Sequence, residues 1–139
     1  MPLMVKVIVV ASYILTILLY KSTVTANTTG NDQDACNVCK CKSKGHDFIV
    51  DCHYKGLTTL PMKMPTNTTK LYLQDNFLNE SAMTDFEYLV PTLQELDISG
   101  NRYKKPFRIP PLLRNLIAAD NYIEDINLFL LNGPNLEKM

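Results

Sequence analysis

A nine-residue pattern, Leu-x-x-Leu-x-Leu-x-x-Asn, recurs three times between residues 68 and 121 and limits the fold more than any other feature. It matches LQELDISGN completely, LRNLIAADN with Ala118 in the third apolar place, and TTKLYLQDN with Thr68 in the first. The closing residues, Asn76, Asn101 and Asn121, are 25 and then 20 residues apart, a spacing within the period of about 20–29 residues of one class of structural repeat. Leucines recurring by chance in an ordinary α/β domain are the alternative. Three matches that all keep the asparagine favour a repeat.

The apolar residues of each pattern alternate, as the buried side of a β-strand requires. The alternating pairs are Leu71 and Leu73, Leu96 and Ile98, and Leu116 and Ala118. Stacked repeats place such strands in a parallel sheet whose apolar faces share one core. Each asparagine is expected to turn the chain away from its strand, with its side-chain amide bonded to backbone groups inside the bend. Residues 81–89 are predicted to form a turn or two of helix, and the proline-rich segment RYKKPFRIPPLLR an extended return.

The N-terminal residues indicate export. One positive charge in the first six residues precedes an apolar run from Val7 to Tyr20, and small residues follow up to Ala26. This run of 14 residues fits a secretory signal peptide and is short for a bilayer span of about 20. Residues 1–26 are therefore predicted to be a cleaved signal peptide, with an uncleaved signal anchor as the alternative. Three Asn-x-Ser/Thr sequons, at Asn27, Asn67 and Asn79, fit a secreted glycoprotein.

All four cysteines, Cys36, Cys39, Cys41 and Cys52, lie in one stretch, CNVCKCKSKGHDFIVDC. An even number of cysteines in an exported chain usually forms disulfides. A zinc site would need two separated pairs of thiolates, and a redox motif would stand at a helix start after a strand; neither fits this stretch. Four cysteines allow three pairings, among which the sequence does not choose. Because residues 48–52 look like a short strand and Gly45 offers a turn, we expect a compact hairpin held by two crosslinks.

From Cys36 to Met139 the chain resembles the extracellular leucine-rich repeat proteins with an N-terminal cysteine cap, which include small leucine-rich proteoglycans, Slit-like proteins and Toll-like receptor ectodomains. The matching features are CNVCKC, then VDC, then GLTTLP, and then the repeats. The resemblance implies the pairs Cys36–Cys41 and Cys39–Cys52. It also implies an α/β-type leucine-rich repeat solenoid, with short parallel strands on a concave face, irregular or short helical returns, and a disulfide-pinned hairpin cap.

The expected domain organisation follows from this resemblance. Residues 1–26 are the signal peptide, 27–35 a flexible segment, 36–65 the cysteine-rich cap, and 66–139 about three repeats with a fourth that is truncated. Members of the family usually carry more repeats and a second cysteine cap. We therefore expect the chain to be an N-terminal fragment, although a genuine short product is the alternative.

In this architecture the non-leucine strand positions are expected to form the concave, ligand-binding face. They are Lys70, Tyr72, Gln74, Glu95, Asp97, Ser99, Asn115, Ile117 and Ala119. Tyr72 is the predicted anchor for a protein ligand, because tyrosine is enriched at binding hot spots; alternatively its ring only covers neighbouring strands. A second candidate site is a basic patch for sulfated glycan or anionic matrix, with a solvated edge as the alternative. Its residues are Arg102, Lys104, Lys105 and Arg108, joined in principle by Lys40, Lys42 and Lys44 of the cap.

No catalytic, metal-binding or phosphate-binding arrangement is recognisable, so neither enzyme activity nor a cofactor is expected. The formal net charge of zero gives no bias toward nucleic acid. No second long apolar run predicts a transmembrane segment. The sequence therefore predicts a secreted or cell-surface module that binds an extracellular protein ligand without covalent chemistry. The alternative is a small disulfide-rich secreted peptide whose activity lies in the cap.

Overall fold

The computed structural model describes residues 34–125, 127 and 135–137. The expected signal peptide, the sequon at Asn27 and most of the segment 27–35 lie outside the described residues. So do the last two residues of the expected fourth repeat, Lys138 and Met139.

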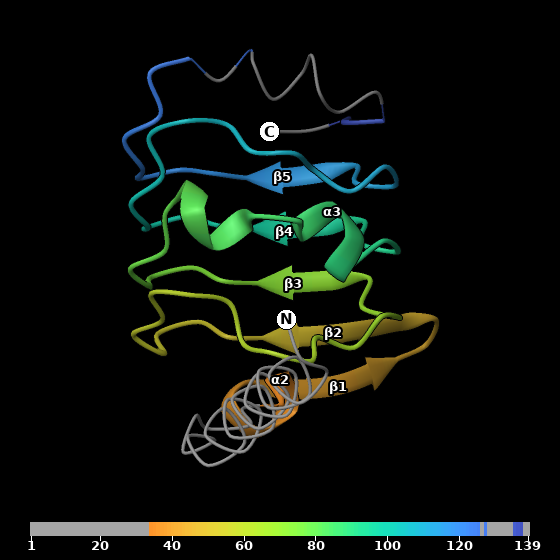
Figure 1. Ribbon diagram of the computed structural model, residues 1–139. Coiled ribbons are helices and arrows are strands. Elements are labelled where there is room, and N and C mark those ends of the chain that lie inside the picture. Colours follow the sequence, from red (N-terminus) through yellow and green to blue (C-terminus); the bar gives the residue numbers. More distant parts are fainter. Residues whose placement is uncertain (1–33, 126, 128–134, 138–139) are drawn as a thin grey trace, which may run out of the picture. The chain divides into compact units, whose positions relative to one another are not determined.

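Five short strands form one sheet in the order of the sequence, β1-β2-β3-β4-β5 (Figure 1). The first pair is antiparallel and the other three pairs are parallel. The strands are β1 (Lys40–Lys44), β2 (Asp47–Asp51), β3 (Lys70–Tyr72), β4 (Glu95–Asp97) and β5 (Asn115–Ile117). The helices are short: α2 (Ala35–Val38), the 3₁₀ helix η1 (Glu80–Met83) and α3 (Phe86–Leu89). Five mostly parallel strands, few helices and disulfides are compatible with a leucine-rich repeat fold.

The cysteine stretch forms a hairpin, β1–β2, whose turn is at Gly45. Gly45 has a φ of 61°, a left-handed conformation that glycine adopts without steric cost. The disulfides join Cys36 to Cys41 and Cys39 to Cys52, which are the two pairs that the resemblance implies. Helix α2 before the hairpin was not predicted; its N-terminus is capped by Asp34, whose carboxylate accepts a hydrogen bond from the Cys36 amide at 3.0 Å.

The hydrophobic core lies between one face of the sheet and the return segments. Strands β2 through β5 and the residues directly after β3 and β4 contribute fully buried side chains, namely Val50, Leu71, Leu73, Leu96, Ile98 and Leu116. The returns contribute Leu78, Met83, Phe86, Tyr103, Phe107 and Ile109. Since Ala35, Cys39 and Cys52 belong to the same cluster, the cysteine hairpin and the repeats share one core.

The first return contains η1 and α3, and the proline-rich middle return contains no helix or strand between Asp97 and Asn115. Both observations match the sequence-based expectations. The expected start of a fourth repeat continues the same bonding. The amide of Glu137 donates to the carbonyl of Arg114 at 2.7 Å, as the amide of Arg114 donates to that of Gln94 at 2.9 Å.

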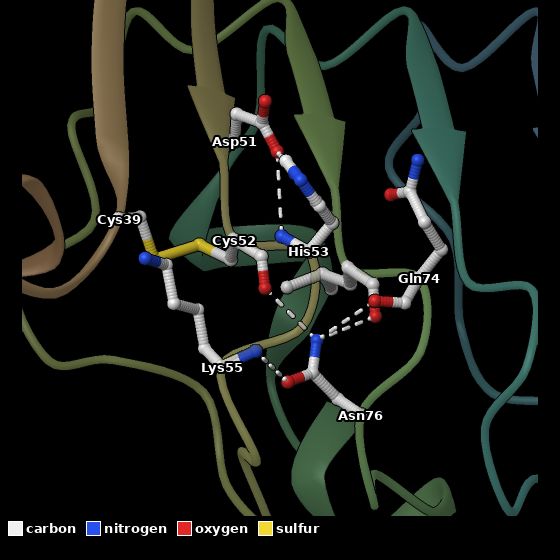
Figure 2. Close-up of polar contacts among 8 residues, drawn as sticks. Cys39, Asp51, Cys52, His53, Lys55, Gln74 and Asn76 are labelled. Carbon is white, nitrogen blue, oxygen red and sulfur yellow. Dashed lines mark hydrogen bonds and ion pairs between the residues drawn. A yellow bond between two sulfur atoms is a disulfide. The ribbon is translucent and has the colours of Figure 1, made fainter.

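The closing asparagines bond to the backbone inside the bends, as predicted. The Asn76 amide nitrogen donates to the carbonyls of Leu73 in its own strand and Cys52 in the preceding segment, both at 2.9 Å (Figure 2). Its oxygen accepts from the backbone amides of Lys55 and Leu57, both at 3.0 Å. Asn101 and Asn121 repeat this arrangement one and two repeats later, with donation to Leu73 and Ile98 and to Ile98 and Ala118, respectively. Each asparagine therefore joins its own repeat to the one before it.

The residue before each closing asparagine has a left-handed backbone. The φ angles are 55° at Asp75, 64° at Gly100 and 52° at Asp120. Aspartate and glycine are among the residues that adopt this conformation at low cost. The dipeptides Asp-Asn, Gly-Asn and Asp-Asn thus fix the same bend in all three repeats.

Candidate binding face

The face of the sheet opposite the core has its own set of side chains, which we call the open face. Because side chains alternate along a strand, residues on either side of a core residue point to the opposite face. The register pairs Ile49, Lys70, Glu95 and Asn115 in one row across β2–β5, and Asp51, Tyr72, Asp97 and Ile117 in the next. Asp47 precedes the first row on β2, and Gln74, Ser99 and Ala119 follow the strands. The nine residues predicted for the concave face therefore lie on the open face, and they are half-buried or exposed.

Tyr72 and Lys70 on β3 are held by acidic side chains from both neighbouring strands. The Tyr72 hydroxyl donates to Glu95 Oε1 at 2.9 Å. The Lys70 ammonium lies 3.7 Å from Glu95 Oε2 and 3.3 Å from Asp47 Oδ2. The side chains of Lys70, Glu95 and Asp47 are 30%, 25% and 35% exposed, so solvent weakens these ion pairs. The hydrogen bond to Glu95 restrains the Tyr72 ring, and the Lys70 ion pair helps to position Glu95.

The proton equilibria of this network follow from its contacts. Desolvation and the hydrogen bond to Glu95 raise the pKa of Tyr72 to about 12. The hydrogen bond to Asp47 and the nearby charge of Glu95 raise the pKa of Lys70. The hydrogen bond from the Thr69 hydroxyl, at 3.0 Å, lowers the pKa of Asp47 despite some desolvation. These pKa shifts keep Tyr72 a neutral phenol, Lys70 an ammonium and Asp47 a carboxylate at neutral pH.

A second polar contact lies at the end of β2, between Asp51 and His53 (Figure 2). The Asp51 carboxylate accepts from the His53 backbone amide at 3.3 Å and contacts its imidazole Nδ1. Although desolvation opposes it, hydrogen bonding from His53 lowers the pKa of Asp51. No role was predicted for His53 from the sequence; in the structure it contacts Asp51.

Three residues of the open face, Asp47, Ile49 and Asp51, were not predicted to lie there. Residues 48–52 were assigned only to the cap hairpin, and no role was given to Asp47. The structure pairs β2 in parallel with β3, so the cap supplies the first strand of the face. Ile49 is 6% exposed but is not part of the core cluster; its register partners Lys42 and Lys70 flank it on the open face. The sequence carried little signal for this role, because the three consecutive apolar residues of DFIVD do not show which face of the strand is buried.

The cap lysines and the return basic patch lie in different parts of the fold. Lys40, Lys42 and Lys44 are on the edge strand β1, opposite Asp51, Ile49 and Asp47. The predicted basic patch, Arg102, Lys104, Lys105 and Arg108, lies in the return after β4, three strands further along the sheet. The structure therefore does not bring together the cap lysines and the return patch, which the sequence had joined only in principle.

Within the return patch, several groups contact the preceding return. The Arg108 guanidinium lies 3.3 Å from Glu87, and the Lys104 backbone amide donates to Glu80 at 3.3 Å. Arg102 stacks over the Phe77 ring, 4.6 Å from its centroid. Tyr103, in the middle of the patch, is fully buried, and desolvation raises the pKa of its hydroxyl. These contacts favour the interpretation of the patch as a packing edge between two returns.

A groove of about 400 Å³ lies between the same two returns. Its lining is Glu80, Met83, Thr84, Asp85, Glu87, Tyr88, Pro106, Phe107 and Arg108. The groove is thus formed by the return segments and not by the open face.

Two of the three sequons lie in the described part of the chain, and both asparagines are exposed. The Asn79 side-chain oxygen caps η1 by accepting from the Ser81 amide at 3.0 Å, which leaves its amide nitrogen outside that bond. Beside Asn67, the hydroxyl of buried Thr68 donates to the Pro65 carbonyl at 2.6 Å.

In the part of the chain that the structure describes, no three His, Cys, Asp or Glu side chains are placed to hold a metal ion. Over the same residues, the structure has no helix with the length and apolar character needed to cross a membrane.

No protein-family model matches the chain. Similar proteins exist among those that have been curated. The chain is 35% identical over 63 residues to leucine-rich repeat-containing protein 3 of Rattus norvegicus, a match that covers 45% of this chain and 24% of that protein. It is 28% identical over 93 residues to leucine-rich repeat-containing protein 3 of Danio rerio, covering 63% of this chain and 35% of that protein.

A third relative is peroxidasin homolog pxn-2 of Caenorhabditis elegans, which is 42% identical over 59 residues, covering 42% of this chain and 4% of that protein. The matches thus span no more than 35% of the length of any of these three relatives. Together with the disulfide-bonded cysteine region, the two leucine-rich repeat relatives support a leucine-rich repeat N-terminal cap and a protein-interaction module. The disulfides are compatible with an extracellular location.

Proposed function

We propose that this chain is a leucine-rich repeat solenoid that binds a protein ligand outside the cell, through its open face and without covalent chemistry. The observation that carries the proposal is the open face itself. Three repeats and the cap strand present side chains there that the core does not use, with the aromatic ring of Tyr72 at a fixed position among them. A ring held in place before binding loses little conformational entropy on contact with a partner. Extracellular matrix, cell adhesion and receptor ectodomains are the settings in which such recognition would operate.

The test is a binding screen of the chain against an array of secreted and cell-surface ectodomains, followed by alanine variants against each partner found. Tyr72→Ala is expected to weaken binding by at least about tenfold, as at other aromatic hot spots. Tyr88→Ala is the matched control, because Tyr88 is 71% exposed on α3 and lies away from the open face. Equal effects of the two substitutions, or an effect of Tyr88→Ala alone, would remove the open face as the binding site.

The alternative of an independently active cysteine peptide is less well supported. In that case the cap, residues 36–65, would fold and act without the repeats. However, Val50 and Cys52 are buried in the same cluster as Leu71 and Leu96, and the carbonyl of Cys52 accepts from Asn76 of the first repeat. A cap cut off at residue 65 would expose the side chains of Val50 and Cys52, and the Cys52 carbonyl would lose its hydrogen-bond donor, Asn76.

The sequons and the return patch add two subsidiary proposals. We propose glycosylation of Asn67 and Asn79, both exposed, which mass spectrometry of the protein secreted from animal cells would detect as glycopeptides. Binding of sulfated glycan at Arg102, Lys104, Lys105 and Arg108 has weaker support, because Glu80 and Glu87 contact the same return. Retention on heparin that does not fall with added salt would contradict it.

A further inference from the structure

Tyr72 stands between two carboxylates on the open face. The register places Asp51 on β2, Tyr72 on β3 and Asp97 on β4 in one row, and neighbouring strands are about 4.8 Å apart. Asp51 Oδ1 contacts His53, and Asp97 Oδ1 accepts from the Ser99 amide at 2.9 Å. Among the described residues, the second oxygen of each carboxylate has no hydrogen-bond partner. The row therefore offers an aromatic ring flanked by two acceptors.

The charges of the central strands are unbalanced. On β2–β4 the open face carries the carboxylates of Asp47, Asp51, Glu95 and Asp97 and the single ammonium of Lys70. The Lys70 ammonium lies within 4 Å of Asp47 and Glu95, so its charge is paired with these two carboxylates and not with Asp51 or Asp97. The negative surplus is therefore concentrated at Asp51 and Asp97.

The two flanking carboxylates differ in their surroundings. Asp51 has Lys40 opposite it on the edge strand β1. Asp97 has Tyr72 on one side and Ile117, which is 37% exposed, on the other. Asp97 is thus the carboxylate whose two partners in the row, Tyr72 and Ile117, are both uncharged, and Ile117 gives it an apolar border.

We propose that the open face binds a protein segment through an arginine side chain, which lies over the Tyr72 ring and between the carboxylates of Asp51 and Asp97. A guanidinium is attracted to the face of an aromatic ring and forms paired hydrogen bonds with carboxylates. Arginine suits the row better than lysine, because its planar fork can stack on the ring while its edge reaches both acceptors. The aliphatic stem of the arginine or a neighbouring apolar residue of the partner fits against Ile117. This inference rests on the proposed function and adds the chemistry of the partner.

The test uses the whole chain labelled with ¹⁵N and titrated with N-acetyl-arginine amide, followed by nuclear magnetic resonance of the backbone amides. N-acetyl-citrulline amide is the matched probe, since it has the same shape without the charge. The expected result is saturable shifts of the amides around Asp51, Tyr72 and Asp97 with the arginine probe and at least about fivefold weaker binding of the citrulline probe.

Variants assign the effect to the row. Asp97→Asn keeps an oxygen for the Ser99 amide but loses the charge, and it is expected to weaken the arginine probe by about fivefold. Asp51→Asn is expected to have a smaller effect because His53 already contacts that carboxylate and Lys40 stands opposite it on β1. Tyr72→Leu removes the ring and is expected to weaken binding by about two- to fivefold. Glu124→Gln, an exposed carboxylate outside the strands, is the control and is expected to change nothing.

Equal binding of the two probes, shifts confined to other residues, or an effect of Glu124→Gln as large as that of Asp97→Asn would overturn the inference. Shifts of the same row on raising the protein concentration without probe would also overturn it, because they would make a second copy of the chain the occupant. These results differ from a failure of the proposed function. If binding of a protein partner depends on Tyr72 but not on Asp97, the inference of an arginine contact is wrong and the proposed function stands. If binding does not depend on Tyr72, the open face is not the binding site.

Discussion

Asn101 shows how much a single side chain contributes at the scale of the residue. Its amide nitrogen donates to the carbonyls of Leu73, Ile98 and Ser99, and its oxygen accepts from the Leu78 amide at 3.0 Å. Asn101 is 4% exposed, so water cannot replace these partners without opening the fold. Backbone groups of two successive repeats therefore depend on one buried amide.

Replacing Asn101 by alanine is predicted to lower the free energy of unfolding by about 3 kcal/mol, because buried backbone groups left without partners cost about 1–3 kcal/mol each. Urea unfolding followed by circular dichroism measures the loss. Asn115→Ala is the matched control: this asparagine is half-buried on the open face, and its removal is predicted to change stability by less than about 0.5 kcal/mol. Similar losses in the two variants would contradict the role assigned to Asn101.

Gly100 is a second position at which the fold depends on one residue, because no space is left there for a Cβ atom. Its φ is 64°, and an added Cβ would collide with the carboxylate of Asp75. Gly45 also has a left-handed φ, 61°, but open space around its Cα. Gly45→Ala is therefore predicted to lower the free energy of unfolding by about 1–2 kcal/mol, the cost of a left-handed backbone alone. Gly100→Ala is predicted to lower it by at least about 1 kcal/mol more, because the added Cβ also overpacks its surroundings. Thermal or urea unfolding checks the order, and Asp75→Ala is predicted to recover part of the loss in the Gly100→Ala background.

At the scale of the residue, the sequence predicted the features that depend on the spacing within a single repeat. The alternating leucines are buried and the asparagines bond inside their bends because both follow from local spacing. The hydrogen bond from Tyr72 to Glu95 could not be predicted in the same way. It joins residues 23 positions apart, and repeats that differ in length leave their relative register open until they stack.

At the scale of the element, the cap is part of the sheet and not a separate lid. Its strand β2 bonds to β3 in register, with Val50 paired to Leu71. The Cys39–Cys52 disulfide ties the start of the hairpin to the end of β2, and both cysteines are buried. The Cys36–Cys41 disulfide closes a shorter loop, and Cys36 is exposed.

Replacing Cys39 and Cys52 together by alanine is predicted to lower the free energy of unfolding by about 3 kcal/mol, as expected for a loop of this length. Replacing Cys36 and Cys41 together is predicted to cost less, about 2 kcal/mol, because the shorter loop restrains the unfolded chain less. Urea unfolding of the two double variants compares the losses. A larger loss for the Cys36 and Cys41 pair would contradict this order and the dependence on loop length from which it follows.

The sequence predicted the hairpin and its turn at Gly45, but not the role of β2 as the first strand of the open face. Strand propensity indicates that residues 48–52 are extended, but it does not say which strand they pair with. In the structure β2 lies parallel to β3, and this pairing buries Val50 beside Leu71; such a contact between distant segments is not contained in local strand propensity. Helix α2 was missed for a related reason: four residues carry no periodic signal, and the cap by Asp34 is a local contact.

At the scale of the whole molecule, the described chain has tyrosines that resist ionisation. Desolvation and Glu95 raise the pKa of Tyr72 to about 12, desolvation raises that of Tyr103, and the hydrogen bond to Asp75 raises that of Tyr54. An unfolded chain loses these protons near pH 10. Between pH 10 and the higher folded values, the folded state therefore binds more protons than the unfolded state, and its stability falls as the pH rises.

The free energy of unfolding is thus predicted to decline from about pH 10 to about pH 12, a window set by Tyr72. The Tyr72→Phe variant lacks this contribution, so its stability relative to the wild type is predicted to improve across the window. Urea unfolding at several pH values compares the two proteins. A difference between them that stays constant with pH would contradict the raised pKa of Tyr72.

The asparagine contacts also have a consequence for the order of assembly during synthesis. The carbonyl of Cys52 receives its side-chain donor from Asn76, and the carbonyl of Leu73 receives a donor from Asn101. A ribosome releases the chain from its N-terminus, so each turn emerges before the residue that completes it. With closing asparagines 25 and 20 residues apart and synthesis at about 5–20 residues per second, each turn waits for roughly 1–5 s. Growth of the fold is therefore directional, and the newest turn is always the least protected one.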